Sequence, residues 1–157
     1  MTARRSAGLL LFRHTGAGLE VLLGHMGGPY FAKKDAGAWT VPKGEYESDE
    51  PAWEAARREF REELGLAPPD GEPIALGEVR QTGGKTVTVW AVEADLDPAA
   101  VEPGTFTMEW PPRSGRTREF PELDRVAWYG LERARELIVT AQAAFLDRLA
   151  EHSSPSA

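Results

Sequence analysis

Apolar residues alternate with polar ones, or run together, in several short segments of the chain, and both patterns are typical of β-strands. Residues 6–13 and 19–26 are two such segments, and the glycine-containing turn between them predicts a hairpin. Residues 74–81 and 85–94 predict a second pair of strands joined by a Thr-Gly-Gly turn. Two shorter strands are expected at residues 39–43 and 126–129.

One segment, residues 51–64, has the period of an α-helix instead. It contains no glycine and is rich in Ala, Glu, Arg and Leu, which favour helices. The side chains of residues 48–50 (Ser-Asp-Glu) are expected to cap its start, and Gly65 to end it. Apolar residues recur at spacings of three and four and form one stripe that faces a core, namely Trp53, Ala56, Phe60 and Leu64.

The order of these elements predicts an α+β fold, with helices on both faces of a mixed sheet. Strands come first, followed by the helix, further strands and a closing helix. The closing helix is expected from Leu131 to about Leu149, with a break near Thr140. The length of 157 residues suits a single domain, residues 1–150, followed by a flexible tail, residues 151–157.

The composition of the chain argues against several classes of function and kinds of site. The apolar fraction of 41% and the charged fraction of 27% are ordinary for a globular domain. The net charge of −7 argues against a general nucleic-acid-binding surface, although it allows a local basic pocket. No segment approaches the roughly 18 to 20 apolar residues of a membrane span, so no membrane partner is expected. The chain has no cysteine, which excludes disulfides and thiolate metal sites and fits a cytoplasmic location.

Three carboxylates share one face of the predicted helix, apart from its apolar stripe. At roughly 100° per residue, Glu59, Glu62 and Glu63 fall within an arc of about 100°. Carboxylates this close repel one another unless a cation lies among them, and their hard oxygen atoms suit Mg²⁺ or Mn²⁺. Arg58 precedes Glu62 by four residues and can pair with it across one helical turn. The pattern predicts a divalent-metal site, and the alternative is a charged helix face exposed to solvent.

The stretch from Gly44 to Leu66 fits the pattern G-x5-E-x7-R-E-U-x-E-E-x-G-U, where U is a bulky apolar residue. This pattern is the signature of the Nudix hydrolases, and the segment resembles it at every fixed position. The resemblance implies an α/β/α sandwich with a mixed β-sheet. It also implies an Mg²⁺- or Mn²⁺-dependent enzyme that hydrolyses a nucleoside diphosphate linked to another group.

The same resemblance implies roles for individual residues. Arg58 would orient the catalytic carboxylates, and Glu50 would support the start of the helix. The base that takes a proton from water differs among Nudix enzymes, so five candidates stay open: Glu59, Glu63, Glu109, Glu119 and Glu122. The implied metal ligands are Glu59, Glu62, Glu63 and a backbone carbonyl at Gly44 or Lys43.

Several residues outside the helix are candidates for substrate binding. Lys43 can meet a phosphate as a point charge or form a salt bridge with Glu45 or Glu47. The alternation of Phe106, Met108 and Trp110 stops at two prolines, and the arginines that follow can clamp a phosphate or form a flexible basic loop. These arginines are Arg113, Arg116 and Arg118. Aromatic residues that can stack on a base, or instead belong to the core, are Trp39, Tyr30, Phe31 and Trp110.

The substrate is not fixed by these residues. Residues 39–44, W-x-x-P-K-G, resemble the dinucleoside polyphosphate and diphosphoinositol polyphosphate branches, although Glu45 replaces the histidine usual there. Sugar nucleotides such as ADP-ribose and oxidised nucleoside triphosphates also stay open. The expected partner is a small nucleotide, and a homodimer is left open. The main rival is a non-catalytic Nudix-fold sensor, but such relatives typically lose carboxylates that this chain keeps.

Overall fold

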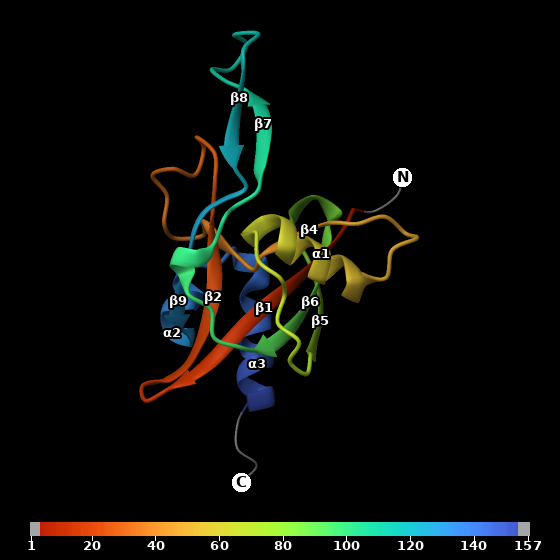
Figure 1. The fold of residues 1–157 in the computed structure, drawn as a ribbon, viewed down its shortest axis with the longest axis vertical. Coiled ribbons are helices and arrows are strands. Elements are labelled where there is room, and N and C mark those ends of the chain that lie inside the picture. The colour runs from red at the N-terminus through yellow and green to blue at the C-terminus, as the bar shows by residue number, and fades with distance from the viewer. Residues whose placement is uncertain (1–3, 154–157) are drawn as a thin grey trace.

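The computed structural model describes residues 4–153, which are built around one central mixed sheet (Figure 1). Its strands run in the order β3-β2-β1-β6-β5, while β4 pairs with β1 and β9 pairs with β2. β1 is antiparallel to β2 and parallel to β6, so the sheet is mixed as predicted. The strands are β1 (Arg5–Thr15), β2 (Gly18–Met26), β3 (Trp39–Thr40), β4 (Lys43–Glu45), β5 (Ile74–Arg80), β6 (Thr86–Glu93) and β9 (Leu123–Gly130).

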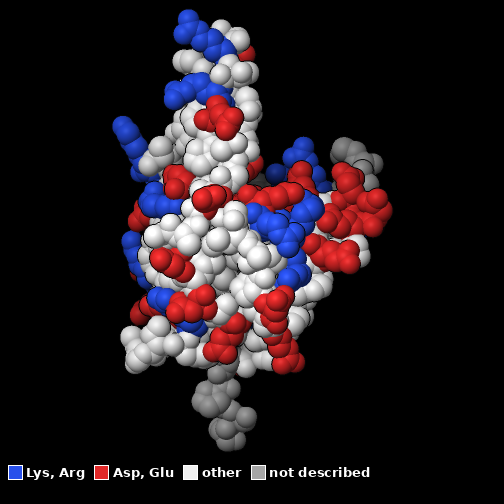
Figure 2. All heavy atoms as spheres, in the orientation of Figure 1, with Lys and Arg blue, Asp and Glu red and all other residues white. Residues whose placement is uncertain are grey.

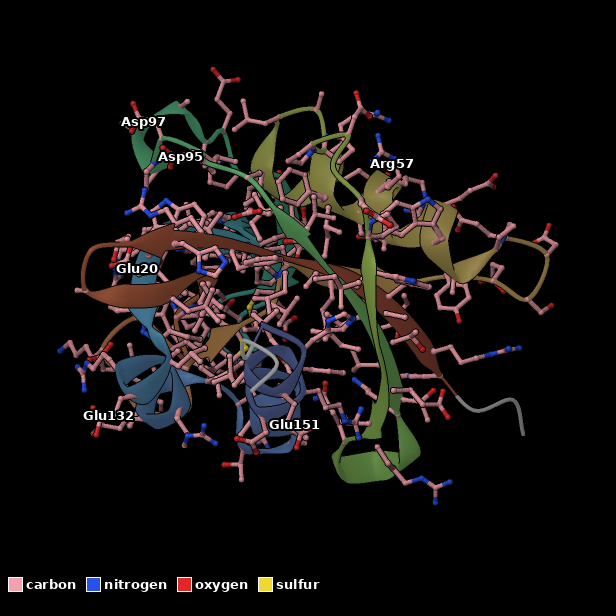
Figure 3. The ribbon with its side chains drawn as sticks, turned by 90° about the horizontal axis from the view of Figure 1, so that it is seen from below. Glu20, Arg57, Asp95, Asp97, Glu132 and Glu151 are labelled. Carbon is pink, nitrogen blue, oxygen red and sulfur yellow. The ribbon has the colours of Figure 1, made fainter. Side chains whose placement is uncertain are left out.

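The apolar run in β1 explains why this strand lies inside the sheet with helices on both faces. Leu9 and Leu11 pack with Phe60 of the signature helix, α1 (Ala52–Leu64), on one face. Leu10 and Phe12 belong to a second core with Phe145 on the other face. Figure 3 shows α1 on one side of the sheet and the carboxy-terminal helices on the other. The predicted α/β/α sandwich is confirmed.

α1 begins and ends close to the predicted positions, but its start is capped differently. Pro51 occupies the cap position, and no side chain makes a capping hydrogen bond, so the prediction for residues 48–50 is wrong. Glu50 instead bonds to Arg58. Gly65 ends the helix at a φ of 69°, and its N–H donates to the Arg61 carbonyl. A Cβ atom at Gly65 would lie 2.4 Å from the Glu102 carbonyl oxygen, so glycine also allows this close contact.

The carboxy-terminal helix is interrupted where the sequence predicts a break. α2 (Leu131–Leu137) and α3 (Ala143–Ser153) are separated by a 3₁₀ turn, Thr140–Gln142. Because α3 continues to Ser153, the predicted flexible tail is wrong for residues 151–153. Residues 154–157 lie outside the described part of the chain. None of the helices formed by residues 4–153 has the length and apolar character needed to cross a bilayer.

A two-stranded arm, residues 105–121, projects from the sheet (Figure 1). It consists of β7 (Thr105–Glu109) and β8 (Thr117–Pro121), which pair antiparallel. The sequence pattern predicts that the strand ends near Pro111 and that a loop follows. The chain does turn there, since the Glu109 carboxylate accepts hydrogen bonds from the N–H groups of Arg113 and Gly115, but it then returns as a strand. The sequence pattern therefore did not predict β8, where it indicates a loop.

Candidate active site

One arginine organises the charged face of α1. The Arg58 guanidinium donates two hydrogen bonds to the Glu50 carboxylate, from Nε at 2.8 Å and from Nη2 at 2.9 Å. Its Nη1 atom donates to Glu59 at 2.7 Å and to Glu62 at 3.2 Å. The paired bonds to Glu50 fix the guanidinium plane, and Arg58 lowers the pKa of Glu50. A single cation thus holds three carboxylates in place.

Gly44 brings the backbone of β4 directly against the Glu59 carboxylate. It lies opposite Ala7 in the antiparallel pairing of β4 with β1. A Cβ atom at this position would lie only 1.9 Å from Oε2 of Glu59. The absence of a side chain is therefore what allows strand and helix to place a main-chain segment beside a carboxylate.

Two helix carboxylates are buried beside a third, Glu122, which directly precedes β9. Glu59 is 8% exposed and Glu63 is 9% exposed. Burial, together with the charges of Glu122 and Glu59, raises the pKa of Glu63 to about 8. Burial also raises the pKa of Glu59, although the hydrogen bond from Arg58 opposes this. Glu122 lies at the solvent-exposed rim, where partial loss of its water raises its pKa. Their raised pKa values indicate that these three carboxylates have too little positive charge around them.

Lys43 supplies a cation on the other side of this group. Burial lowers the pKa of Lys43, and the charge of Glu63 opposes that change. Glu45, one of the two salt-bridge partners considered for Lys43, lies 3.8 Å from the Arg4 guanidinium instead. Lys43 lines the same cavity as Glu63 and Glu122, where an anionic ligand can reach it.

A cavity of about 210 Å³ lies beside these groups. Its polar wall is formed by Lys43, Glu63 and Glu122, and most of the remaining wall is apolar. Apolar walls with a few convergent polar groups are typical of small-molecule sites. Figure 2 shows acidic residues gathered over α1 and the loop that precedes it, and cationic residues at the end of the arm. The other lining residues are Met26, Gly27, Phe31, Thr40, Phe106 and Leu123.

The cavity is held together by main-chain contacts between segments distant in sequence. The N–H of Gly27 donates to the Glu122 carbonyl at 3.0 Å, and the N–H of Glu122 donates to the Gly104 carbonyl at 2.7 Å. A Cβ atom at Gly104 would lie 2.5 Å from the Glu62 carbonyl oxygen. The end of β2, the base of the arm and α1 are thus joined around Glu122.

The sequence profile of the NUDIX domain matches residues 2–149, nearly the whole chain. The chain belongs to the Nudix family. It is a pyrophosphohydrolase of the Nudix type, as the signature in α1 predicts. Among curated proteins, none matches the chain.

Solved Nudix structures share the fold of this chain. An Ap4A hydrolase from C. elegans, in a binary complex, is 20% identical, with a TM-score of 0.66, and the match covers 96% of this chain and 97% of that one. The NUDIX domain of NrtR from Shewanella oneidensis, with ADP ribose, is 13% identical, with a TM-score of 0.65 and coverage of 98% and 90%. The Nudix hydrolase RenU from M. smegmatis is 26% identical, with a TM-score of 0.55 and coverage of 100% and 91%.

Nudix enzymes generally use divalent metal ions, and the donors in this structure fit one. Glu59, Glu62 and Glu63 would hold the ion with a backbone carbonyl at Gly44, a set of hard oxygen donors. The close approach of Gly44 to Glu59 and the raised pKa of Glu63 both mark a place where a cation is favourable. Within residues 4–153 no three His, Asp or Glu side chains are gathered closely enough to hold a metal ion. Arg58 donates hydrogen bonds to two of the signature carboxylates, Glu59 and Glu62. A metal ion bound there would compete with Arg58 for Glu59 and Glu62.

Three of the predicted substrate contacts do not lie where the sequence suggests. Trp39 is 1% exposed, its ring packs edge-on against His25 and Tyr129, and its Nε1 donates to Asp35, so it is a core residue and not a stacking platform. Arg113 and Arg116 are exposed in the turn between β7 and β8, at the far end of the arm, and the structure does not bring them to the carboxylates.

The remaining candidates differ in whether they line the cavity. Phe31 lines it, whereas Tyr30 is not among its lining residues and is 57% exposed. Of the three later glutamates considered as bases, Glu122 lines the cavity. Glu109 binds the turn of the arm, and Glu119 pairs with Thr107 within it. The structure therefore brings Glu122 together with the signature carboxylates.

Several residues around the site carry no signal in the sequence alone. Phe106 lines the cavity from the base of the arm. Buried His25 joins β9 to the loop that follows β2, since Nδ1 lies 2.9 Å from the Asp124 carboxylate and Nε2 lies 2.6 Å from the Lys34 carbonyl. Buried Gln142 accepts a hydrogen bond from the N–H of Val41, just before Lys43. These contacts join distant segments, so spacing along the chain does not reveal them.

Replacing Gly44 by alanine is expected to reduce activity strongly while the protein stays folded. The added Cβ atom would overlap the Glu59 carboxylate and push it from its position. We expect a loss of about tenfold or more in kcat/KM, measured from initial rates of pyrophosphate-bond hydrolysis. Gly16→Ala is the matched control, because a Cβ atom there meets nothing within 4 Å. Equal activities of the two variants would contradict the role of this contact.

Proposed function

We propose that this Nudix enzyme hydrolyses the phosphoanhydride bond of a nucleoside diphosphate linked to another group, and that it requires Mg²⁺ or Mn²⁺. The observation that carries the proposal is the cavity bordered by Lys43, Glu63 and Glu122, next to the carboxylates of α1. Its apolar part can receive a nucleoside, while its charged end meets the phosphates. The solved Ap4A hydrolase and the NUDIX domain with ADP ribose, which share the fold, support a nucleotide ligand of this class.

The proposed reaction is attack of water on one phosphorus of the anhydride. The water oxygen bonds to that phosphorus, while the bond to the bridging oxygen breaks and the bridging oxygen leaves with its electron pair on the other phosphate. A bound divalent ion would supply positive charge that offsets the repulsion between the anionic substrate and the attacking oxygen. The products are two phosphate monoesters or shorter phosphate chains.

Glu122 is the residue we propose to take the proton of the attacking water. It borders the cavity, and its raised pKa moves it towards the range in which a base works well near neutral pH. Glu59 is engaged by Arg58, and Glu63 is buried with its pKa raised to about 8. Lys43 would bind a phosphate oxygen as a point charge and reduce its repulsion from Glu63.

The proposal is tested by incubating the full chain with ADP-ribose and with diadenosine tetraphosphate, with Mg²⁺, with Mn²⁺ or with a chelator. We expect nucleotide products only with a metal ion. Reaction in ¹⁸O-labelled water, followed by mass spectrometry of the products, identifies the phosphorus that water attacks. A sensor would bind these ligands and release no product at any metal concentration, and that result would overturn the proposed activity.

A further inference from the structure

The arm at the edge of the cavity has two unlike faces. Phe106 pairs with Phe120 and Met108 pairs with Arg118, so these four side chains lie on one face, here called the inner face. The residues between them are Thr105, Thr107, Glu109, Thr117, Glu119 and Pro121, and they form the outer face. Phe106, Met108 and Phe120 are half-buried, whereas the outer-face residues of β7 are exposed. A lone two-stranded ribbon with one aromatic and cationic face is suited to contact with a ligand.

The inner face continues the wall of the cavity. Phe106 lines the cavity at the base of the arm, and its ring would lie 3.0 Å from a Cβ atom at Gly28. Farther along, the rings of Trp110 and Tyr30 meet edge-on, with centroids 5.5 Å apart. The inner face therefore opposes the loop that follows β2, and both are anchored at the cavity.

The inner face also carries positive charge in a chain whose net charge is −7. The Arg118 guanidinium lies over the Phe120 ring, 5.4 Å from its centroid. Figure 2 shows basic residues along the arm and at its end, beside acidic ones. Aromatic rings beside guanidinium groups recognise a base that carries phosphates, through stacking and through charge.

The arm is long enough to contact the far end of a large substrate. Each strand has five residues, which corresponds to about 17 Å at the usual rise per residue. A phosphate at the α1 carboxylates therefore lies too far from the upper part of the arm to touch it. A second nucleoside, joined to the first through a chain of phosphates, is long enough to reach it.

We propose that the inner face of the arm binds the distal nucleoside of a two-ended substrate, and so favours dinucleoside polyphosphates over nucleoside diphosphates with a small leaving group. This inference rests on the proposed function, because it concerns the part of the substrate that does not react. Trp110 and Arg118 determine specificity in this arrangement, with Trp110 next to the base and Arg118 next to the phosphates.

The test compares diadenosine tetraphosphate with ADP-ribose, which shares an adenosine diphosphate half but carries no second base. We expect Trp110→Ala and, separately, Arg118→Gln to lower kcat/KM for diadenosine tetraphosphate about tenfold, mainly through KM. The same variants should change kcat/KM for ADP-ribose less than twofold. Thr107→Ala on the outer face is the matched control and should leave both substrates unchanged. Equal losses for both substrates, or no loss for either, would overturn the inference.

Binding measured without turnover separates this inference from the proposed function. Isothermal titration calorimetry of diadenosine tetraphosphate, in the presence of a chelator, reports affinity even if the wild-type protein hydrolyses neither substrate. A tenfold weaker Kd for Trp110→Ala and Arg118→Gln, with wild-type affinity for Thr107→Ala, supports the arm as a binding surface. An unchanged Kd in both inner-face variants refutes it, whatever the activity of the wild type. Arg118→Gln keeps the aromatic residues of the arm and removes the positive charge beside Phe120.

Discussion

Replacing Glu63 by glutamine is expected to lower kcat for phosphoanhydride hydrolysis by about a hundredfold or more, while the protein stays folded. Glutamine has nearly the shape of glutamate but cannot carry the negative charge that attracts a divalent ion. The carboxylate it replaces is buried between Glu59 and Glu122, at the place where that charge has most effect. Initial rates with diadenosine tetraphosphate or ADP-ribose, at saturating Mg²⁺ or Mn²⁺, measure the change.

The matched control for this variant is Glu54→Gln on the same helix. Glu54 is exposed in the first turn of α1, so its loss changes the net charge equally without touching the cavity. We expect Glu54→Gln to keep wild-type rates. Circular dichroism of both variants checks the fold. Wild-type turnover in Glu63→Gln would show that catalysis does not need the Glu63 carboxylate.

The metal-free protein is expected to lose stability as the pH rises from about 5 to 8. The folded-state pKa of Glu63 is raised to about 8, above its ordinary value of 4.5, so the folded protein holds a proton that the unfolded chain releases. The stability linked to this proton is complete below the unfolded pKa and is lost as the pH rises through the folded pKa. Glu59 and Glu122 are shifted in the same direction. We expect the free energy of unfolding to fall by roughly 2 kcal/mol.

Urea denaturation at pH 5.5 and at pH 8, with a chelator present, measures this loss. Glu63→Gln should reduce the difference between the two pH values, because its amide does not titrate. Adding Mg²⁺ or Mn²⁺ at pH 8 should stabilise the wild type more than the variant, since a bound ion offsets the negative charge of the deprotonated Glu63 carboxylate. Equal pH dependence in the two proteins would show that Glu63 is not the group responsible.

The parts of the fold and the site that depend on local sequence were predictable. α1 follows from helix-forming residues, an apolar stripe and Gly65, all within a short segment. The shared face of Glu59, Glu62 and Glu63 follows from helical geometry alone, and so does the pairing of Arg58 with Glu62. β1, β2, β5 and β6 follow from runs of apolar residues between turns.

The parts that depend on distant contacts were not predictable from spacing. Trp39 was considered as a stacking residue, but His25 and Tyr129, from two other strands, enclose its ring. β8 lacks an apolar pattern of its own, and it is extended because it pairs with β7. Glu122 could not be chosen over Glu109 and Glu119, since the cavity that distinguishes them is assembled from segments far apart in the chain.

The parallel pairing of β1 with β6 affects how the protein is made. β1 begins at Arg5, whereas β6 ends at Glu93, and the two strands meet along eight pairs of residues from Arg5–Thr86 to Phe12–Glu93. A ribosome that adds about 5 to 20 residues per second completes β6 on the order of ten seconds after β1. During that interval the nascent β1 has no partner on one of its edges, and its leucines lack the contacts that bury them in the folded protein. Translation that stops before residue 86 therefore leaves a fragment with an unpaired apolar strand edge, which favours aggregation.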